Sequence, residues 1–336
     1  MVDSSGTPVS RGPVTLGIVG DIGGTNCRLA LVHLGETPPR LAPPREYLCA
    51  NYPTAEDCIR DFLKQECDSP VPGCAVLAAA GPVLDGVVTM TNNKWRLDEN
   101  QLATDLGIRK VKLINDFAAQ ALATPLLGPA DTALIGPDVP GMAGSNLAIM
   151  GPGTGFGCAA LAGGTHTGLL VTEGGHIAFA PSDDVERQVL HILAQRYGRV
   201  SIERILAGQG IADLHSALEQ IENRPVSQLT AAQITEAAKS GDRDSIETLD
   251  RFCAILGAVA GDLTLALGAQ GGVFIAGGIA PRLLKELEAG PFRARFEDKG
   301  RFVNYMKAIP TRVITVNNVA LRGVADELTR VAASVK

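Results

Sequence analysis

The feature that most limits how this chain can fold is a glycine-rich motif that occurs twice. Val19–Cys27 reads VGDIGGTNC and Met150–Cys158 reads MGPGTGFGC, and their first glycines, Gly20 and Gly151, lie 131 positions apart. Each motif follows an apolar run and leads into another, which predicts a β-hairpin. The cysteines that end the two motifs keep the same separation. Two related halves, each presenting a glycine hairpin to one cleft, is the simplest interpretation.

The rest of the chain alternates between strand and helix patterns. With 336 residues it is longer than one ordinary core requires, which predicts two domains. Apolar runs predict strands at Cys74–Ala80, Val111–Ile114 and Val273–Ala276, separated by helical patterns, so the fold class is α/β. The proline- and glycine-rich segment 125–145 predicts a linker close to the domain boundary.

Capping residues indicate where several helices begin. Thr54 precedes an apolar stripe of helical period, with Asp57 at the third helical position. Ser182 is predicted to cap a helix that runs through Tyr197, and Ser201 to cap the next one.

Composition argues against several classes of function. The 30 basic and 36 acidic residues include no long basic run, so nucleic acid is not an expected partner. The seven cysteines form no C-x-x-C pair, so neither disulfides nor structural zinc are predicted, and a reducing cytoplasm fits. Residues 1–13 lack an apolar core and are predicted to be a disordered tail, not a signal peptide. The segment 253–269 carries Asp262 and is too short for a membrane span.

The glycine hairpins are candidate phosphate sites, because backbone N–H groups can converge on oxygen where Cβ atoms are absent. Neither motif has the Walker or Rossmann spacing, and neither opens a helix. Asp21 lies beside the first turn. A carboxylate facing phosphate needs a cation between them, and Mg²⁺ held through water meets that need. The alternatives are a tight hairpin and a turn aspartate that bonds its own backbone.

Asn115 and Asp116 stand where a predicted strand ends and an alanine-rich helix begins. Sheets of α/β proteins carry their sites at the carboxyl ends of strands, which makes Asp116 a candidate catalytic base. In phosphoryl transfer such a base orients the hydroxyl and accepts its proton late. Asn115 could position the substrate through its amide. A helix cap is the alternative for this pair.

Three further side chains could recognise a neutral sugar, whose hydroxyls both donate and accept hydrogen bonds. Glu173 and His176 flank a glycine pair, and Glu203 lies in the first turn of the helix that Ser201 is predicted to cap. The alternatives are a structural histidine and a first-turn glutamate that complements the helix dipole. The segment 271–281 is a strand and a glycine loop that would admit a flat ring such as adenine, or else a helix-packing turn.

Together these segments resemble the bacterial glucokinase family of the hexokinase and actin-like ATPase superfamily. The resemblance covers about residues 14–330. It rests on GDIGGTN at 20–26, MTNNKW at 90–95, LINDFAAQ at 113–120, GPGTGFG at 151–157, EGGHIAFAP at 173–181, SIERILAG at 201–208, GGVFIAGGIAPR at 271–282 and FEDKGRF at 296–302. The zinc-binding cysteine motif of repressor-type sugar kinases is missing from the sequence. FEDKGRF is expected to form an exposed charged loop.

The resemblance implies a two-domain actin-like, ribonuclease H-like fold with a cleft between the domains. The small domain would comprise 14–125 with about 316–336, and the large domain 126–315. It implies that Asp116 is the base and that Asn115, Asp116, Glu173, His176 and Glu203 bind glucose. It also implies that ATP is bound by Gly20, Asp21, Ile22, Gly23, Gly24, Thr25, Gly153, Thr154, Gly155, Gly277 and Gly278, with Mg²⁺ held through water by Asp21.

The expected activity is therefore transfer of the γ-phosphate of Mg·ATP to the 6-hydroxyl of glucose, the first step of glycolysis, by a cytoplasmic homodimer. Three alternatives remain at this point. One is a kinase for another hexose, such as mannose or fructose. The second is a non-catalytic sugar or nucleotide sensor, for which a base at Asp116 would have no use. The third is an actin-like filament or chaperone ATPase, which would leave the 173–176 and 201–204 segments without a role.

Overall fold

The structure is a computed structural model that describes residues 14–36, 39–67, 71–90 and 93–335. The chain divides into two compact units: Met1–Leu126 with Asn317–Lys336, and Leu127–Val316. The predicted tail, 1–13, lies outside the described residues. Both units combine sheet and helix, as the α/β prediction requires. Within the described ranges, no helix combines the length and apolar character that a bilayer crossing needs.

The first unit is built on a six-stranded sheet whose main path is β3-β2-β1-β5-β8. Strands β1 and β2 form the predicted antiparallel hairpin, β5 and β8 follow parallel to β1, and β4 pairs with β2. Every residue of β5 is buried, which is typical of a central parallel strand. The strands are β1 Leu16–Ile22, β2 Asn26–His33, β3 Arg40–Leu41, β4 Arg45–Leu48, β5 Cys74–Ala79 and β8 Lys110–Asn115, with a separate pair of β6 Val87–Thr89 and β7 Arg96–Asp98.

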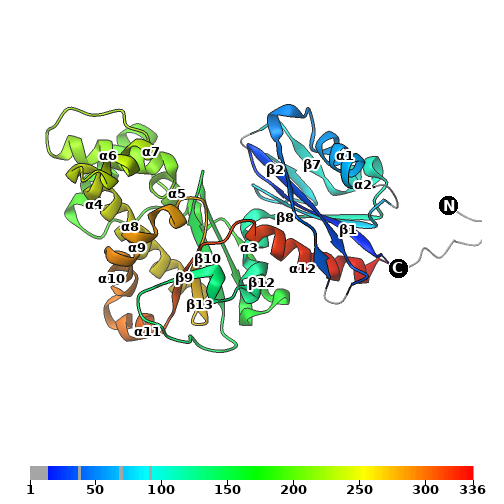
Figure 1. Ribbon diagram of the computed structural model, residues 1–336. Coiled ribbons are helices and arrows are strands. Elements are labelled where there is room, and N and C mark those ends of the chain that lie inside the picture. The colour runs from blue at the N-terminus through cyan, green and yellow to red at the C-terminus, as the bar shows by residue number, and fades with distance from the viewer. Residues whose placement is uncertain (1–13, 37–38, 68–70, 91–92, 336) are drawn as a thin grey trace, which may run out of the picture. The chain divides into compact units, whose positions relative to one another are not determined.

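Four helices complete this unit: α1 Ala55–Glu66, α2 Glu99–Leu106, α3 Asp116–Ala123 and α12 Val319–Ser334. Thr54 caps α1 as predicted, accepting the N–H of Asp57 at 3.1 Å. Helix α12 comes from the carboxyl-terminal end of the chain and packs against α3, β1 and β5 (Figure 1). A Cβ at Gly323 would lie 1.9 Å from the carbonyl oxygen of Ala119, so α12 approaches α3 closely because position 323 has no side chain.

The second unit has a six-stranded sheet of order β12-β11-β10-β13-β14-β9. Its hairpin, β10–β11, is followed by the parallel strands β13 and β14, in the same arrangement as in the first unit. The repeated hairpin layout is thus confirmed. The strands are β9 Thr132–Ile135, β10 Leu147–Pro152, β11 Phe156–Leu161, β12 Leu169–Thr172, β13 Gly272–Ile275 and β14 Thr311–Ile314.

The match between the two motifs ends at their cysteines. Cys27 pairs with Ile22 across the first hairpin, whereas Cys158 pairs with Met150 across the second. The residue pairs nearest the two turns, Ile22 with Cys27 and Pro152 with Phe156, fall at different places in the two motifs. The equal spacing of the cysteines therefore does not correspond to equivalent positions in the sheets.

One prediction about the segment 125–145 was wrong, because this segment is more than a linker. Strand β9 lies within it and pairs antiparallel with β14. The buried Thr311 donates its hydroxyl to the carbonyl of Ile135 at 2.5 Å. Strand β9 forms the edge of the second sheet through its pairing with β14. The prolines and glycines around its four residues hid the strand pattern in the sequence.

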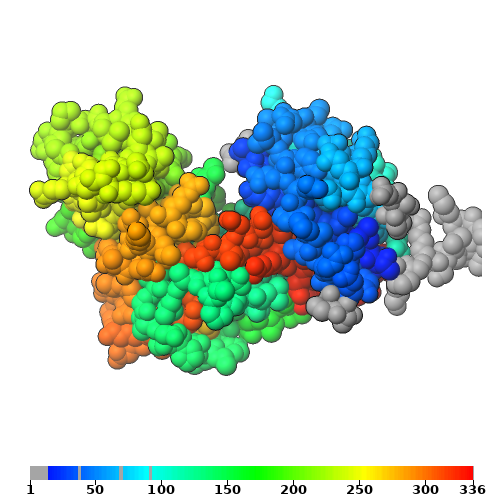
Figure 2. All heavy atoms as spheres, in the orientation of Figure 1, coloured from blue at the N-terminus to red at the C-terminus, as the bar shows by residue number. Residues whose placement is uncertain are grey.

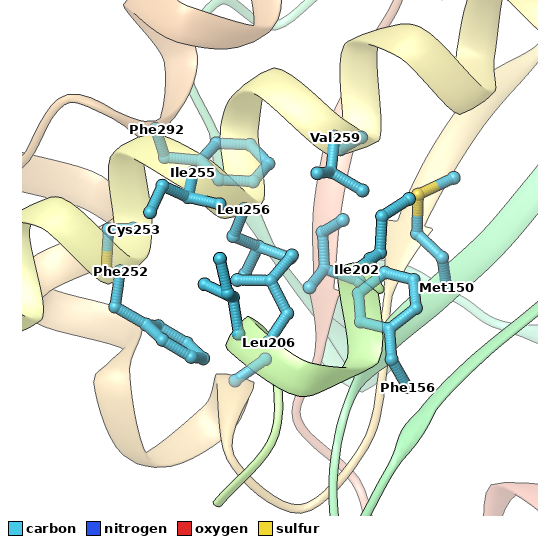
Figure 3. Packing of buried hydrophobic residues seen from close by; sticks show 14 of the residues in the cluster. Met150, Phe156, Ile202, Leu206, Phe252, Cys253, Ile255, Leu256, Val259 and Phe292 are labelled. Carbon is cyan, nitrogen blue, oxygen red and sulfur yellow. The ribbon is translucent and has the colours of Figure 1, made fainter. Parts of the chain in front are cut away.

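Helix α8 forms the centre of the second unit's core. In Figure 3, Phe252, Leu256 and Val259 of α8 lie close to Leu206 and Ile202 in one buried cluster. Figure 2 shows that the yellow and orange parts of this unit adjoin on its surface. Helices α8 and α10 pack against each other. The helices are α4 Asp184–Tyr197, α5 Ile202–Ile205, α6 Gly208–Ile221, α7 Ala231–Lys239, α8 Arg243–Leu267, α9 Leu284–Ala289, α10 Phe292–Glu297 and α11 Val303–Lys307.

The cap of α4 was predicted one residue too early. Asp183, not Ser182, is the cap, and its carboxylate accepts the N–H of Glu186 at 2.8 Å. Arg251 holds the same carboxylate at 2.5 Å, which favours an acidic cap over a hydroxyl. The Ser182 N–H instead donates to the Glu186 carboxylate. The cap predicted at Ser201 is confirmed, since it accepts the N–H of Arg204.

The expectation that 296–302 forms an exposed charged loop was wrong in part, since Asp298 and Arg301 are exposed but Phe296 and Lys299 are not. Phe296 is fully buried at the end of α10. The Lys299 ammonium donates to the carbonyl of Ala258 at 2.9 Å and pairs with Asp262 at 2.7 Å, and its side chain is only 11% exposed. The charge is buried because these two acceptors on α8 satisfy it.

Candidate functional site

The first glycine hairpin is held at its turn by backbone and side-chain contacts. The Gly23 N–H donates to the carbonyl of Asn26 at 2.9 Å, and the N–H of Cys49 donates to the carbonyl of Thr25 at 2.8 Å. The Gly23 carbonyl also faces the Cys49 thiol and the Asn93 amide, both at 3.5 Å. The predicted phosphate-binding residues 20–25 therefore occupy the end of β1 and the anchored turn, 23–25, that leads into β2.

Asp21 is the acidic side chain of this hairpin. It lies near the carboxyl end of β1, 22% exposed, with the Arg28 guanidinium 3.7 Å from its carboxylate. Burial raises the pKa of Asp21 above its ordinary value, and Arg28 offsets this only in part. Arg28 also bonds Glu46 at 3.2 Å, so it is shared between two carboxylates. A cation at Asp21 would relieve the cost of its charge.

The described residues include no cluster of three or more histidine, cysteine, aspartate or glutamate side chains that could cage a metal. Mg²⁺ that is bound together with phosphates usually takes one or two protein carboxylates and completes its shell with water and the phosphates. A single carboxylate at Asp21 fits that mode of binding.

Asn115 and Asp116 lie at the junction of β8 and α3, as the sequence predicted. The side-chain oxygen of Asn115, Oδ1, accepts the N–H groups of Phe117 at 2.9 Å and Ala118 at 3.2 Å, so this residue caps α3. Its side-chain nitrogen, Nδ2, donates to the backbone carbonyl of Gly81 at 3.1 Å. The carboxylate of Asp116, the first residue of α3, accepts the N–H of Phe117 at 2.9 Å.

The second glycine hairpin is packed against two other backbone segments. The Gly153 N–H donates to Gly155 at 2.7 Å, and the first N–H of α6, at Gly208, donates to the carbonyl of Gly153 at 3.1 Å. Gly277 has a φ of +82°, and a Cβ there would lie 2.2 Å from the carbonyl oxygen of Pro152. The turn at 277–278 thus meets the hairpin itself, while a Cβ at Gly278 would meet open space.

Glu173 and His176 lie on a short segment that is fastened to the one carrying Glu203. The short 3₁₀ helix η6, Gly174–His176, contains His176 and follows Glu173 directly. Backbone bonds connect the two segments, with Phe179 donating to Val200 at 3.1 Å and Ile202 to Ile177 at 2.9 Å. The structure therefore brings these three predicted sugar-binding residues onto neighbouring segments of the second unit.

Two features of this region escaped the sequence analysis. Arg199 donates its guanidinium to the carbonyl of His176 at 2.6 Å, which fixes the end of η6. The Glu203 carboxylate accepts the N–H of Phe156 at 2.9 Å, just after the second glycine turn. Contacts between a side chain and a distant backbone group leave no periodic signal in a sequence, so neither could have been read from it.

A cavity of about 580 Å³ begins at Gly208, where α6 meets the hairpin. Its polar lining includes Gln209, Asp213 and Ser227, and the capped start of α7 at Thr230 borders it. Asp213 is buried and bonds Arg196 and Tyr197, both at 2.8 Å. A larger cavity, of about 720 Å³, is lined mainly by charged residues of α8 and its neighbours and contains none of the predicted site residues.

Known proteins with the same pattern are sugar kinases. Residues 18–331 match the family model for glucokinase. The glucokinase of Caulobacter sp. strain K31 is 53% identical over 318 residues, which cover 94% of this chain and 96% of that protein. The crystal structure of a glucokinase from an Antarctic psychrotroph is 35% identical with a TM-score of 0.84, covering 94% of this chain and 99% of that one.

A more distant likeness concerns the fold alone. A ROK family glucokinase from Streptomyces griseus, solved in complex with glucose and AMPPNP, is 20% identical with a TM-score of 0.61, covering 93% of this chain and 98% of that one. These likenesses confirm the predicted actin-like ATPase fold.

Proposed function

Because the chain belongs to the glucokinase family and is an ATP-dependent glucokinase, we propose that it transfers the γ-phosphate of ATP to the 6-hydroxyl of glucose. Asp116 is the proposed base. The observation that carries this assignment is its position at the first residue of α3, directly after the strand β8. A loose phosphoryl-transfer transition state needs no preformed alkoxide, so the carboxylate orients the hydroxyl and accepts its proton late.

Asn115, Glu173, His176 and Glu203 are the proposed partners of the other sugar hydroxyls. Asn115 is already committed as a helix cap through its oxygen, and one amide hydrogen goes to Gly81. Its second amide hydrogen is the group that it can offer to a hydroxyl. Glu173 and His176 are exposed and Glu203 is half-buried, which suits groups that exchange water for a sugar.

The proposal assigns the ATP phosphates to the turns at 20–25 and 153–155. The cavity beside Gly208 is the proposed place for the nucleoside, since it adjoins the second glycine turn. Gly277 packs against the same hairpin, and we place Gly277 and Gly278 near the nucleoside. Asp21 would hold Mg²⁺ through water, and the ion would supply charge neutralisation for the phosphates. We further propose a cytoplasmic homodimer that serves the first step of glycolysis.

A coupled assay with Mg·ATP and four sugars tests the activity. We expect ADP formation with glucose to exceed that with mannose, fructose or N-acetylglucosamine, with a 6-phosphate product. If another hexose were preferred, the glucose assignment would fall. If ATP bound and no sugar stimulated ADP release, the chain would be a sensor, and the kinase proposal would fail.

Asp116→Ala tests the base. Removal of a general base costs about 10²- to 10⁴-fold in rate, so we expect kcat to fall by roughly 1000-fold. Calorimetry should show glucose binding within a few-fold of the unmodified protein. Near-normal turnover would remove Asp116 from the mechanism, and lost glucose binding together with a changed circular dichroism spectrum would indicate misfolding instead. His176→Ala serves as the comparison, since it should raise the KM for glucose more than it alters that for ATP.

A further inference from the structure

Glu203 contacts the second glycine hairpin as well as lying among the proposed sugar residues. Its Oε2 accepts the N–H of Phe156 at 2.9 Å, and Phe156 directly follows the Gly153–Gly155 turn. A Cβ at Gly155 would lie 2.3 Å from that same oxygen. The carboxylate therefore occupies the space that a side chain at position 155 would need.

Phe156 is held on its other sides too. Its carbonyl oxygen would lie 2.2 Å from a Cβ at Gly175, which belongs to η6. Its ring is 6% exposed and lies near Met150 and Ile202 in the buried cluster (Figure 3). Two segments that carry proposed sugar-binding residues thus clamp the backbone of a single hairpin residue, one through a carboxylate and one through a glycine contact.

We infer that Glu203 is a positioning residue that connects the sugar side of the site to the nucleotide side. Oε2 fixes the hairpin through Phe156, and Oε1, which makes no hydrogen bond within the described part of the chain, is left to accept from a sugar hydroxyl. One carboxylate then serves both substrates. This inference rests on the proposed role of the second hairpin in phosphate binding.

The bond from a backbone N–H to a carboxylate is charge-assisted, and its loss leaves the Phe156 N–H without its partner. The hairpin then relaxes before any nucleotide arrives. Glu203→Ala removes the acceptor, whereas Glu203→Gln keeps an oxygen at the same reach. We therefore expect Glu203→Ala to weaken Mg·AMPPNP binding about tenfold in the absence of sugar, and Glu203→Gln to weaken it by less than about twofold.

Calorimetry with Mg·AMPPNP and no sugar is the deciding experiment, with circular dichroism to establish that each variant folds. His176→Ala is the matched control, because its side chain makes no hydrogen bond to the hairpin within the described residues. It should bind AMPPNP normally. The inference is overturned if Glu203→Ala binds AMPPNP like the unmodified protein, if Glu203→Gln fails as badly as Ala, or if His176→Ala shows the same loss.

Gly155→Ala provides a second route if Glu203→Ala does not fold. The added methyl group displaces the carboxylate, so AMPPNP binding should weaken by about tenfold, and unchanged binding would overturn the inference. If Glu203→Ala does fold, the losses in the double variant should not add, because both substitutions break the same contact. Additive losses would overturn the inference. The experiment measures AMPPNP binding without turnover, so a chain without glucose kinase activity could still pass it. Failure of the proposed function can therefore be distinguished from failure of this inference.

Discussion

The two glycine hairpins occupy the same place in two sheets of the same strand order, yet different groups surround them. In the first, a Cβ at Gly20 would lie 2.7 Å from the side chain of Leu77, which can move. In the second, a Cβ at Gly151 would lie 2.0 Å from the carbonyl oxygen of Ala276, which is part of a strand-end backbone. At these two equivalent positions, side chains bound the first hairpin and main chain bounds the second.

The carboxylates differ in origin as well. Asp21 belongs to the first hairpin itself, whereas Glu203 reaches the second from the start of α5. The two hairpins share a strand order but differ in the source of their carboxylate. The first hairpin carries its own, Asp21, whereas the second is held by Glu203 from another segment.

The largest expected effect comes from removing the charge of the first hairpin. Asp21→Asn should lower kcat/KM by roughly 10³-fold, because the anionic phosphates would lose the Mg²⁺ that we propose the carboxylate holds. Thr154→Ala, in the exposed turn of the second hairpin, should cost less than about tenfold. Steady-state kinetics across Mg²⁺ concentrations measures both. Equal losses of kcat/KM in the two variants would contradict the proposed difference between the two hairpins.

The next effect is on stability. Gly151→Ala should lower the free energy of unfolding by about 3 kcal/mol, because a backbone carbonyl cannot yield to the new methyl group. Gly20→Ala should cost about 1 kcal/mol, because the ends of Leu77 and Leu29 can rotate away. Urea unfolding at fixed pH compares the two variants. A larger loss for Gly20→Ala would show that side chains constrain the first hairpin as strictly as backbone constrains the second.

A smaller effect is expected at the fastening of η6. Arg199→Ala removes the guanidinium that holds the carbonyl of His176, so the KM for glucose should rise about fivefold with kcat nearly unchanged. Arg187→Ala is the control, since that exposed arginine forms an ion pair with Asp184 on its own helix and, among the described residues, with no other carboxylate. Initial-rate kinetics at saturating ATP tests the pair. A change confined to the KM for ATP would assign Arg199 to the nucleotide side instead.

The parts of this comparison that could be read from the sequence are those with a local signal. Apolar runs on either side of glycine turns predicted both hairpins, and the apolar strand before Asn115 predicted the junction with α3. Ser182 and Asp183 are both good capping residues, and the choice between them depends on Arg251, which lies far away in the sequence. The Glu203–Phe156 bond and the burial of Lys299 likewise depend on contacts between distant segments.

The smallest expected effect is on thermal stability, and it concerns the charge of Asp21 apart from its proposed role in activity. Burial raises the folded-state pKa of Asp21 above its ordinary value of 3.8, so the ionised carboxylate destabilises the fold at neutral pH. Asp21→Asn should therefore raise the thermal midpoint at pH 7, although activity is lost. The gain should shrink as pH falls through the raised folded-state pKa, and it should vanish below the unfolded-state pKa, where the carboxyl group is protonated in both states.

Asp98→Asn is the control of opposite sign. The N–H of Gln101, and to a lesser extent that of Asn100, lowers the pKa of Asp98, so its charge stabilises the fold above the unfolded-state pKa. Asp98→Asn should lower the midpoint at pH 7, and this loss should fade as pH falls through the folded-state pKa. Calorimetric scans of both variants from about pH 7 down to about pH 2, below the unfolded-state pKa of a carboxyl group, test the pair. If Asp21→Asn also destabilised at pH 7, the bond to Arg28 would outweigh burial, and the first hairpin would gain stability from its charge.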